Sequence, residues 1–148
     1  MSLLIVVGHG NALAQRTVNV ACPSDMYRRA EAALARADDD WNSLLKHQRV
    51  FAPCDDGAMA EGYSEIVVTK LADHWDRFGS FAAISKRYPA FRRWAIGHID
   101  ASASEEDLKK IILNARKCAG DLQAKSLCAT VRRAAADALS EQRRLSDK

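Results

Sequence analysis

The stretch GAMAEGYSEIVVTKLADHW, residues 57–75, decides the fold class of this chain. The embedded run Ile66–Thr69 has β-branched character, but no turn residues precede it, so a strand is disfavoured there. Large apolar side chains instead recur every four residues, at Tyr63, Val67, Leu71 and Trp75. This spacing places them on one face of an α-helix, with Ile66 alongside. We therefore expect a helix at the centre of the core.

The apolar run SLLIVVGHGNALAQ, residues 2–15, has two incompatible interpretations. As a first strand at Leu3–Val7 it would need partner strands, which the rest of the chain does not supply. As the end of a secretion signal it needs an apolar run and small residues before a cut, here Ala12-Leu13-Ala14. The positively charged opening of such a signal is missing. We favour the signal, with residues 1–14 as its cleaved or disordered remnant and residues 15–148 as one helical domain.

The remaining chain has a nearly continuous helical pattern. We expect helices over residues 24–36, 38–51, 57–75, 77–88, 89–98, 104–118 and from 123 onward. Ser24 or Asp25 is expected to cap the first, and Ser104 with Asp107 has capping-box spacing. Gly62 within the central helix predicts a close crossing of another helix. The fold class is therefore all-α, with six to seven helices stacked as antiparallel hairpins.

Four cysteines, Cys22, Cys54, Cys118 and Cys128, are compatible with reduced thiols, a metal site or two disulfides. No C-x-x-C pair occurs and no histidine is close in sequence to a cysteine, which disfavours zinc. In an exported chain an even count indicates bridges. Hairpin topology brings Cys22 to Cys54 and Cys118 to Cys128, and we expect these two disulfides. Reduced thiols in a cytosolic protein are the alternative.

Charge and hydropathy narrow the function classes. The chain has 22 Lys plus Arg against 19 Asp plus Glu, a formal net charge of +3. This is too small and dispersed to indicate a nucleic-acid partner. No run approaches the length of about 18 apolar residues that a membrane span needs. We expect no nucleic-acid partner, no membrane span, no metal and no cofactor.

Catalysis has little support in the sequence. His47, His74 and His98 lie near apolar residues, as core-edge or surface histidines do, and Ser64 lacks the G-x-S-x-G pattern. Four carboxylates crowd one region: Asp55, Asp56, Glu61 and Glu65. Helix capping and solvation account for them, so we expect no catalytic residue. The alternative is a small periplasmic enzyme or ligand-binding protein that uses this acidic region with a nearby histidine.

The segment CDDGAMAEGYSEIVVTKLADHW, residues 54–75, resembles bacterial periplasmic immunity proteins, which neutralise cell-wall-degrading effectors of contact-dependent secretion systems. The resemblance implies a periplasmic or secreted, non-enzymatic protein that plugs the cleft of a partner enzyme with a loop. Two loops are candidate plugs, and their expected partner-binding residues are Asp55, Asp56, Glu61, Asp100 and Ser102. Ordinary helix capping is the alternative role for both loops, and a homodimer is left open.

Overall fold

The computed structural model describes residues 21–148, so the predicted leader at 1–14 and the alternative strand Leu3–Val7 lie outside the described residues. Within 21–148 the chain is all-α, as predicted, with seven α-helices, two short 3₁₀ turns and no strand. These elements are α1 (Ser24–Ala37), α2 (Trp41–Phe51), η1 (Ala52–Cys54), α3 (Gly57–Asp73), η2 (Trp75–Arg77), α4 (Phe78–Arg87), α5 (Pro89–Gly97), α6 (Glu105–Arg116) and α7 (Leu122–Ser146).

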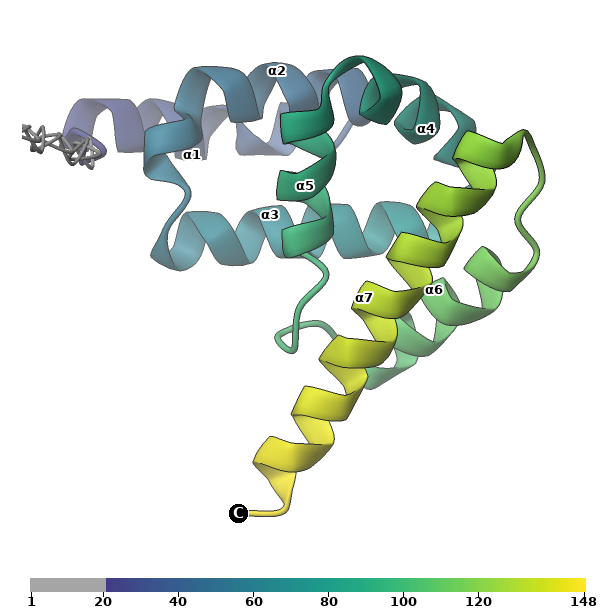
Figure 1. Cartoon of the computed structure of the whole chain (residues 1–148). Coiled ribbons are helices and arrows are strands. Elements are labelled where there is room, and N and C mark those ends of the chain that lie inside the picture. The colour runs from purple at the N-terminus through teal and green to yellow at the C-terminus, as the bar shows by residue number, and fades with distance from the viewer. Residues whose placement is uncertain (1–20) are drawn as a thin grey trace, which may run out of the picture.

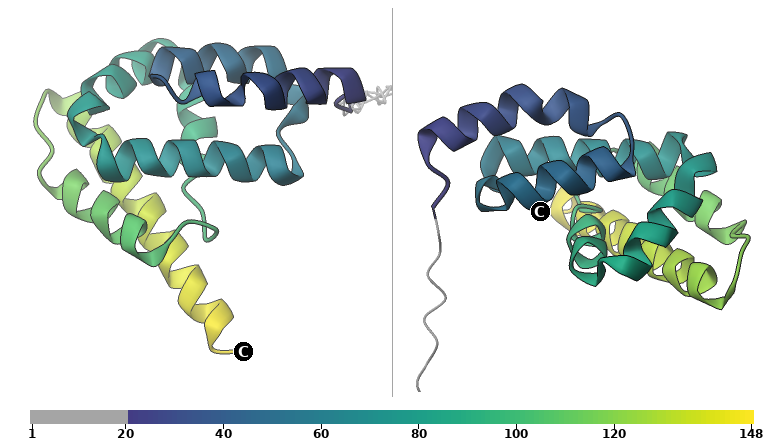
Figure 2. Two further views of the ribbon diagram at one scale, coloured as in Figure 1. Left: turned by 180° about the vertical axis from the view of Figure 1, so that it is seen from behind. Right: turned by 90° about the horizontal axis from the view of Figure 1, so that it is seen from above.

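The helices form two antiparallel hairpins joined by a short helical corner (Figure 1). Helices α1 and α2 make the first hairpin, and α3 runs beneath it. Helices α6 and α7 make the second hairpin, in which α6 packs on α3. The short helices α4 and α5 connect the two parts, because α4 contacts α2 and both contact α7. Figure 2 shows that the C-terminal end of α7 extends away from the first hairpin.

Helix α3 lies at the centre of the core, as its apolar spacing predicts. Tyr63, Val67 and Leu71 are all at most 1% exposed. Trp75 differs from the prediction, because α3 ends at Asp73 and Trp75 begins the turn η2. The backbone at His74, with φ −123° and ψ 42°, leaves the helical region and causes this early end.

One of the two predicted side-chain caps is present. Ser104 accepts a hydrogen bond from the Asp107 backbone N–H (3.0 Å), as its spacing predicts. The expected cap by Ser24 or Asp25 is wrong, because Pro23 occupies the N-cap of α1 and no side chain caps it. The fixed φ of proline suits a helix start even without such a cap.

Both predicted disulfides are present. Cys22 is bonded to Cys54 with a Cα–Cα distance of 4.7 Å, and Cys118 to Cys128 with 6.2 Å. Both distances are in the ordinary range for disulfides. The first ties the start of α1 to η1, and the second ties the end of α6 to the first turns of α7.

At Gly62 the predicted close crossing is only a side-chain contact, because α1 packs mainly on α2 and reaches α3 through the end of Leu34. A Cβ atom at Gly62 would lie 2.7 Å from Cδ2 of Leu34, on α1.

Among residues 21–148, no helix combines the length and apolar character that crossing a membrane requires.

Candidate functional site

Four polar side chains meet where η1, α3 and the end of α5 come together. We call Asp55, Ser64, His98 and Asp100 the polar cluster. Asp55 follows η1, which the Cys22–Cys54 disulfide holds in place. Ser64 lies on α3, and His98 is the C-cap of α5. The core therefore brings together polar residues from three separate segments of the chain.

The polar cluster is a continuous chain of hydrogen bonds. Ser64 Oγ donates to Asp100 Oδ2 (2.9 Å) and lies 3.0 Å from His98 Nδ1. His98 Nε2 lies 3.2 Å from Asp55 Oδ2, the same oxygen that accepts from Trp94 Nε1 (2.7 Å). Ser64 and His98 are only 4% and 8% exposed. The order of groups is thus carboxylate, imidazole, hydroxyl and carboxylate.

The Ser64 hydroxyl joins the two halves of this chain. It gives its one proton to Asp100, and its oxygen lies against His98 Nδ1. The His98 ring therefore reaches Asp55 directly and Asp100 through Ser64. This arrangement ties three elements together through one side chain.

Asp100 is held as a carboxylate. Burial alone would raise its pKa, but hydrogen bonds from Ser102 and Ser64 and the nearby His98 outweigh it, so the pKa lies below its ordinary value. Its Oδ1 accepts from the Ser102 backbone N–H (2.8 Å) and from Ser102 Oγ (2.5 Å). Asp100 therefore joins the buried cluster to the turn that follows it.

A second buried network stiffens the same region. His47, at 6% exposure, bridges the Tyr63 hydroxyl (2.8 Å) and the Ala30 carbonyl oxygen (2.9 Å). Burial, with a smaller contribution from the charge of Asp55, raises the pKa of Tyr63 well above its ordinary value. The Tyr63 ring also packs edge-on against Trp94 at 5.0 Å. The polar cluster thus rests on a rigid aromatic support.

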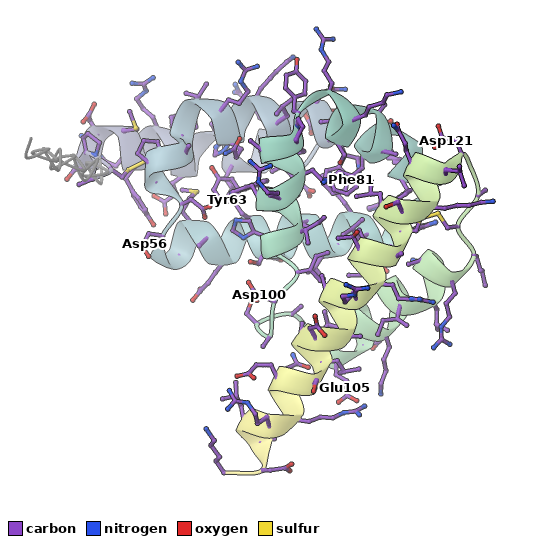
Figure 3. All side chains as sticks on the ribbon, in the orientation of Figure 1. Asp56, Tyr63, Phe81, Asp100, Glu105 and Asp121 are labelled. Atoms are coloured by element: carbon purple, nitrogen blue, oxygen red, sulfur yellow. A yellow bond between two sulfur atoms is a disulfide. The ribbon has the colours of Figure 1, made fainter. Side chains whose placement is uncertain are left out.

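The segment from Asp100 to Ser104, here called loop 100–104, is also held from behind by α7. Gln142 Nε2 donates to the carbonyl oxygens of Ala101 (3.0 Å) and Ala103. Ser104 caps α6 and ends the loop. In Figure 3, Asp100 lies in this loop beside the lower half of the α6–α7 hairpin. The loop is therefore fixed at its beginning, its middle and its end.

A small hollow of about 340 Å³ separates this loop from α3. Its walls carry hydroxyls and carboxylates, from Ser64, Ser102 and Ser104 and from Glu61, Glu65 and Asp107. An acidic lining opposes the negative charge that develops on oxygen in acyl transfer. It suits cations or hydrogen-bond donors instead. Within residues 21–148, no three His, Cys, Asp or Glu side chains are placed to hold a metal ion.

The structure separates the five residues predicted to bind a partner into two groups. Asp100 and Ser102 lie in loop 100–104, with Glu61 on the opposite wall of the hollow. Asp55 faces inward to Trp94 and His98, and its side chain is 21% exposed. Asp56 is exposed and caps α3 by accepting from the Gly57 backbone N–H (2.8 Å).

The alternative of a histidine beside the acidic region has its geometry in His98, whose Nε2 lies 3.2 Å from Asp55 Oδ2. The sequence indicates neither Trp94 nor the contact of His98 with Ser64. The two polar residues are 34 positions apart and lie in no common motif. Their only signal in the sequence is that each lies inside or beside a strongly apolar stretch. This signal does not indicate which polar residues meet in the fold. Comparison with known proteins finds no matching family model, no matching curated sequence and no matching solved structure.

Proposed function

We propose that this chain is a non-enzymatic binding protein that works outside the reducing cytosol and occludes the cleft of a partner enzyme with loop 100–104. One observation carries the proposal. The loop is exposed at Ser102, yet it is fixed by Ser64, by its own Asp100 turn and by Gln142. A loop that is already ordered loses little conformational freedom on binding, so more of the contact energy goes into affinity.

The surroundings of the loop indicate the chemistry of the partner cleft. Glu61 and Glu65 border the hollow beside the loop, and neither has a cation within 4.0 Å among residues 21–148. The first turn of α6 also holds Glu105, Glu106 and Asp107, which pair with lysines of the same helix. In the described part of the chain, the unpaired negative charge beside the loop is therefore that of Glu61 and Glu65. A cleft lined by basic residues or hydrogen-bond donors is complementary to this acidic face.

The two disulfides support this compartment. Bridges of this kind persist in the periplasm or outside the cell and are rare in a reducing cytosol. Both close the ends of helical hairpins, so they stabilise the scaffold that presents the loop. Two bridges of this kind are expected in a periplasmic or secreted inhibitor. The resemblance of residues 54–75 to periplasmic immunity proteins supports the same compartment.

Site-specific photocrosslinking tests the proposal. A benzoylphenylalanine at Ser102 in the native host is expected to crosslink one envelope protein. The same group at Arg133, exposed on α7, is the control and is expected to give no crosslink. No crosslink from position 102, or the same crosslink from both positions, would refute the role of the loop.

A variant of the loop support sharpens this test. Gln142→Ala removes the donor that holds the carbonyls of Ala101 and Ala103. We expect affinity for the crosslinked protein to fall by about tenfold while the helical content is retained, because the loop then has to be ordered on binding. Arg133→Ala, at an exposed position of α7 farther from the loop, is the control.

A second candidate function is a serine hydrolase, favoured by the order of Asp55, His98 and Ser64 in one hydrogen-bonded chain. In this function the Ser64 hydroxyl turns its proton from Asp100 to His98 Nδ1, which takes it as the hydroxyl oxygen attacks an acyl carbon and the carbonyl becomes an oxyanion. A fluorophosphonate probe would then add one covalent group to the wild-type protein and none to Ser64→Ala. No mass increase in the wild type supports the binding function and excludes this one.

A further inference from the structure

A second hollow lies at the opposite end of the α6–α7 hairpin from loop 100–104. It has a volume of about 970 Å³ and runs between the η2–α4–α5 corner and the turn that joins α6 to α7. We call it the groove. In Figure 3 Asp121 marks the groove end of the hairpin, and Asp100 marks the loop end. The stretch of α7 from Leu122 to Gln142 spans about 30 Å at a rise of about 1.5 Å per residue.

The walls of the groove are largely apolar. Trp75, Ala82 and Pro89 lie on one wall, and Leu127 on the other. Leu122 stands at the edge with 84% of its surface exposed, the most exposed large apolar side chain of the described residues. The rest of the described chain leaves both the apolar walls of the groove and Leu122 uncovered. A partner segment that lies along the groove can cover both.

The rim of the groove is basic. Lys86, Arg92 and Lys117 line it, and none has a carboxylate within 4.0 Å in the part of the chain that the structure describes. The one acidic residue of the lining, Asp121, is engaged as the N-cap of α7, where it accepts from the Ala124 backbone N–H (2.8 Å). The charge of the rim is therefore available to an acidic ligand.

A buried hydroxyl at the groove is another sign of an incomplete surface. Ser85 is 3% exposed and lines the groove, and its Oγ has no hydrogen-bond partner within the described residues. Buried polar atoms are normally paired, so this oxygen in the groove wall stands out as unpaired among the described residues.

We propose that the groove binds an acidic, amphipathic segment of a partner protein. Its apolar side chains enter between α4 and the α6–α7 turn and cover Leu122, while its carboxylates meet Lys86, Arg92 and Lys117. The acidic face around loop 100–104 and this basic groove need opposite chemistry. The groove is thus a separate interaction surface, which stands or falls independently of the role of the loop.

Peptide selection tests the proposal without a known partner. A phage-displayed library of random 12-residue peptides is panned against the oxidised protein. We expect the recovered sequences to be enriched in Asp and Glu together with Leu, Phe or Ile. A fluorescein-labelled peptide of the consensus sequence is then used to measure affinity by fluorescence polarisation.

Two pairs of variants locate the binding site. Lys86→Glu with Lys117→Glu is expected to weaken binding by about tenfold, because two of the three charges of the rim are reversed. Arg132→Glu with Arg133→Glu makes the same change in net charge outside the groove and is expected to leave the affinity within about twofold.

The second pair of variants tests whether a larger side chain in the groove prevents binding. Gly79 lines the groove, and a Cβ atom added to it would meet no atom within 4 Å outside its own stretch of helix, so Gly79→Leu places a large side chain at the groove. It is expected to abolish peptide binding, and Ala32→Leu on the exposed face of α1 is its control. Circular dichroism checks that all variants stay folded.

Three outcomes would overturn the proposal. The first is that panning recovers no peptide, or peptides without an acidic excess. The second is that the groove variants bind the consensus peptide as well as their controls do. The third is that dodecanoate displaces the peptide at micromolar concentration, which would make a small anionic amphiphile the occupant.

Discussion

Removal of the Cys22–Cys54 disulfide should destabilise the protein more than removal of Cys118–Cys128, because it closes the longer loop. The sequence separations are 32 and 10 residues. In the loop-entropy description these lengths correspond to about 3.7 and about 2.7 kcal/mol of stabilisation at room temperature. The expected difference is therefore about 1 kcal/mol.

Packing losses largely cancel in this comparison. In each disulfide one cysteine lies in the core, Cys54 at 1% exposure and Cys128 at 2%. The other cysteine, Cys22 or Cys118, is partly buried. Replacing each pair by two alanines therefore removes similar buried volume at both sites. What remains is the difference in loop length.

Urea unfolding of the two double-alanine variants, followed by far-ultraviolet circular dichroism, measures the two free energies. Each variant is compared with the wild type at the same pH and without reductant. Equal losses, or a larger loss for the Cys118–Cys128 pair, would refute the reasoning. A larger m-value in both variants is expected, since the uncrosslinked chains expose more surface when unfolded.

Three further changes test the packing and the titrating groups. Asp100→Asn should reduce the loss of stability below about pH 4. The pKa of Asp100 is lowered in the folded state, so its carboxylate stabilises the fold above the unfolded pKa, and this contribution is lost as the pH falls through the folded pKa. Tyr63→Phe should reduce the loss of stability above about pH 10, where the unfolded chain ionises its tyrosine and burial keeps Tyr63 protonated in the folded state. Both are read from unfolding free energies against pH, and unchanged slopes would contradict them. Gly79→Ala should raise the unfolding free energy by about 1 kcal/mol. Gly62→Ala should raise it by less, because the Cβ atom added at Gly62 meets the side chain of Leu34. Equal gains would show that the contact with Leu34 costs nothing.

Local signals explain why most helix boundaries follow from the sequence. A cap such as Ser104 works through a hydrogen bond to a residue three positions away, so its pattern is visible in a short window. The start of α1 shows the limit of the same signal. Ser24 and Asp25 have the side chains of caps, but the proline before them sets the helix start through its backbone alone.

The disulfide pairing is predictable from the order of the helices, rather than from a short window of sequence. Once helices are assigned, a short turn between two of them implies an antiparallel hairpin, and residues at its ends become neighbours. Cys22 with Cys54 and Cys118 with Cys128 satisfy this rule. The compartment and the function that we attach to these bridges remain proposals.

The polar cluster is not predictable in this way. Ser64 and His98 meet because α5 crosses α3, and the crossing depends on the packing of many apolar side chains. Lys70 shows the same limit. It is a charged residue on the central helix, yet it is 4% exposed and donates to the Asp38 carbonyl oxygen (2.5 Å). No local pattern distinguishes such a lysine from a solvated one, because its partner is 32 residues away.

The α6–α7 hairpin explains how one small domain can present two surfaces of opposite charge. At one end Gln142 fixes loop 100–104, and at the other the Cys118–Cys128 bond fixes the turn that forms a wall of the groove. Because about 30 Å of rigid helix separates the two ends, an acidic segment in the groove does not neutralise the acidic face at the loop at physiological salt, where screening acts over about 8 Å. Simultaneous binding at both ends is therefore expected to show additive rather than competing affinities.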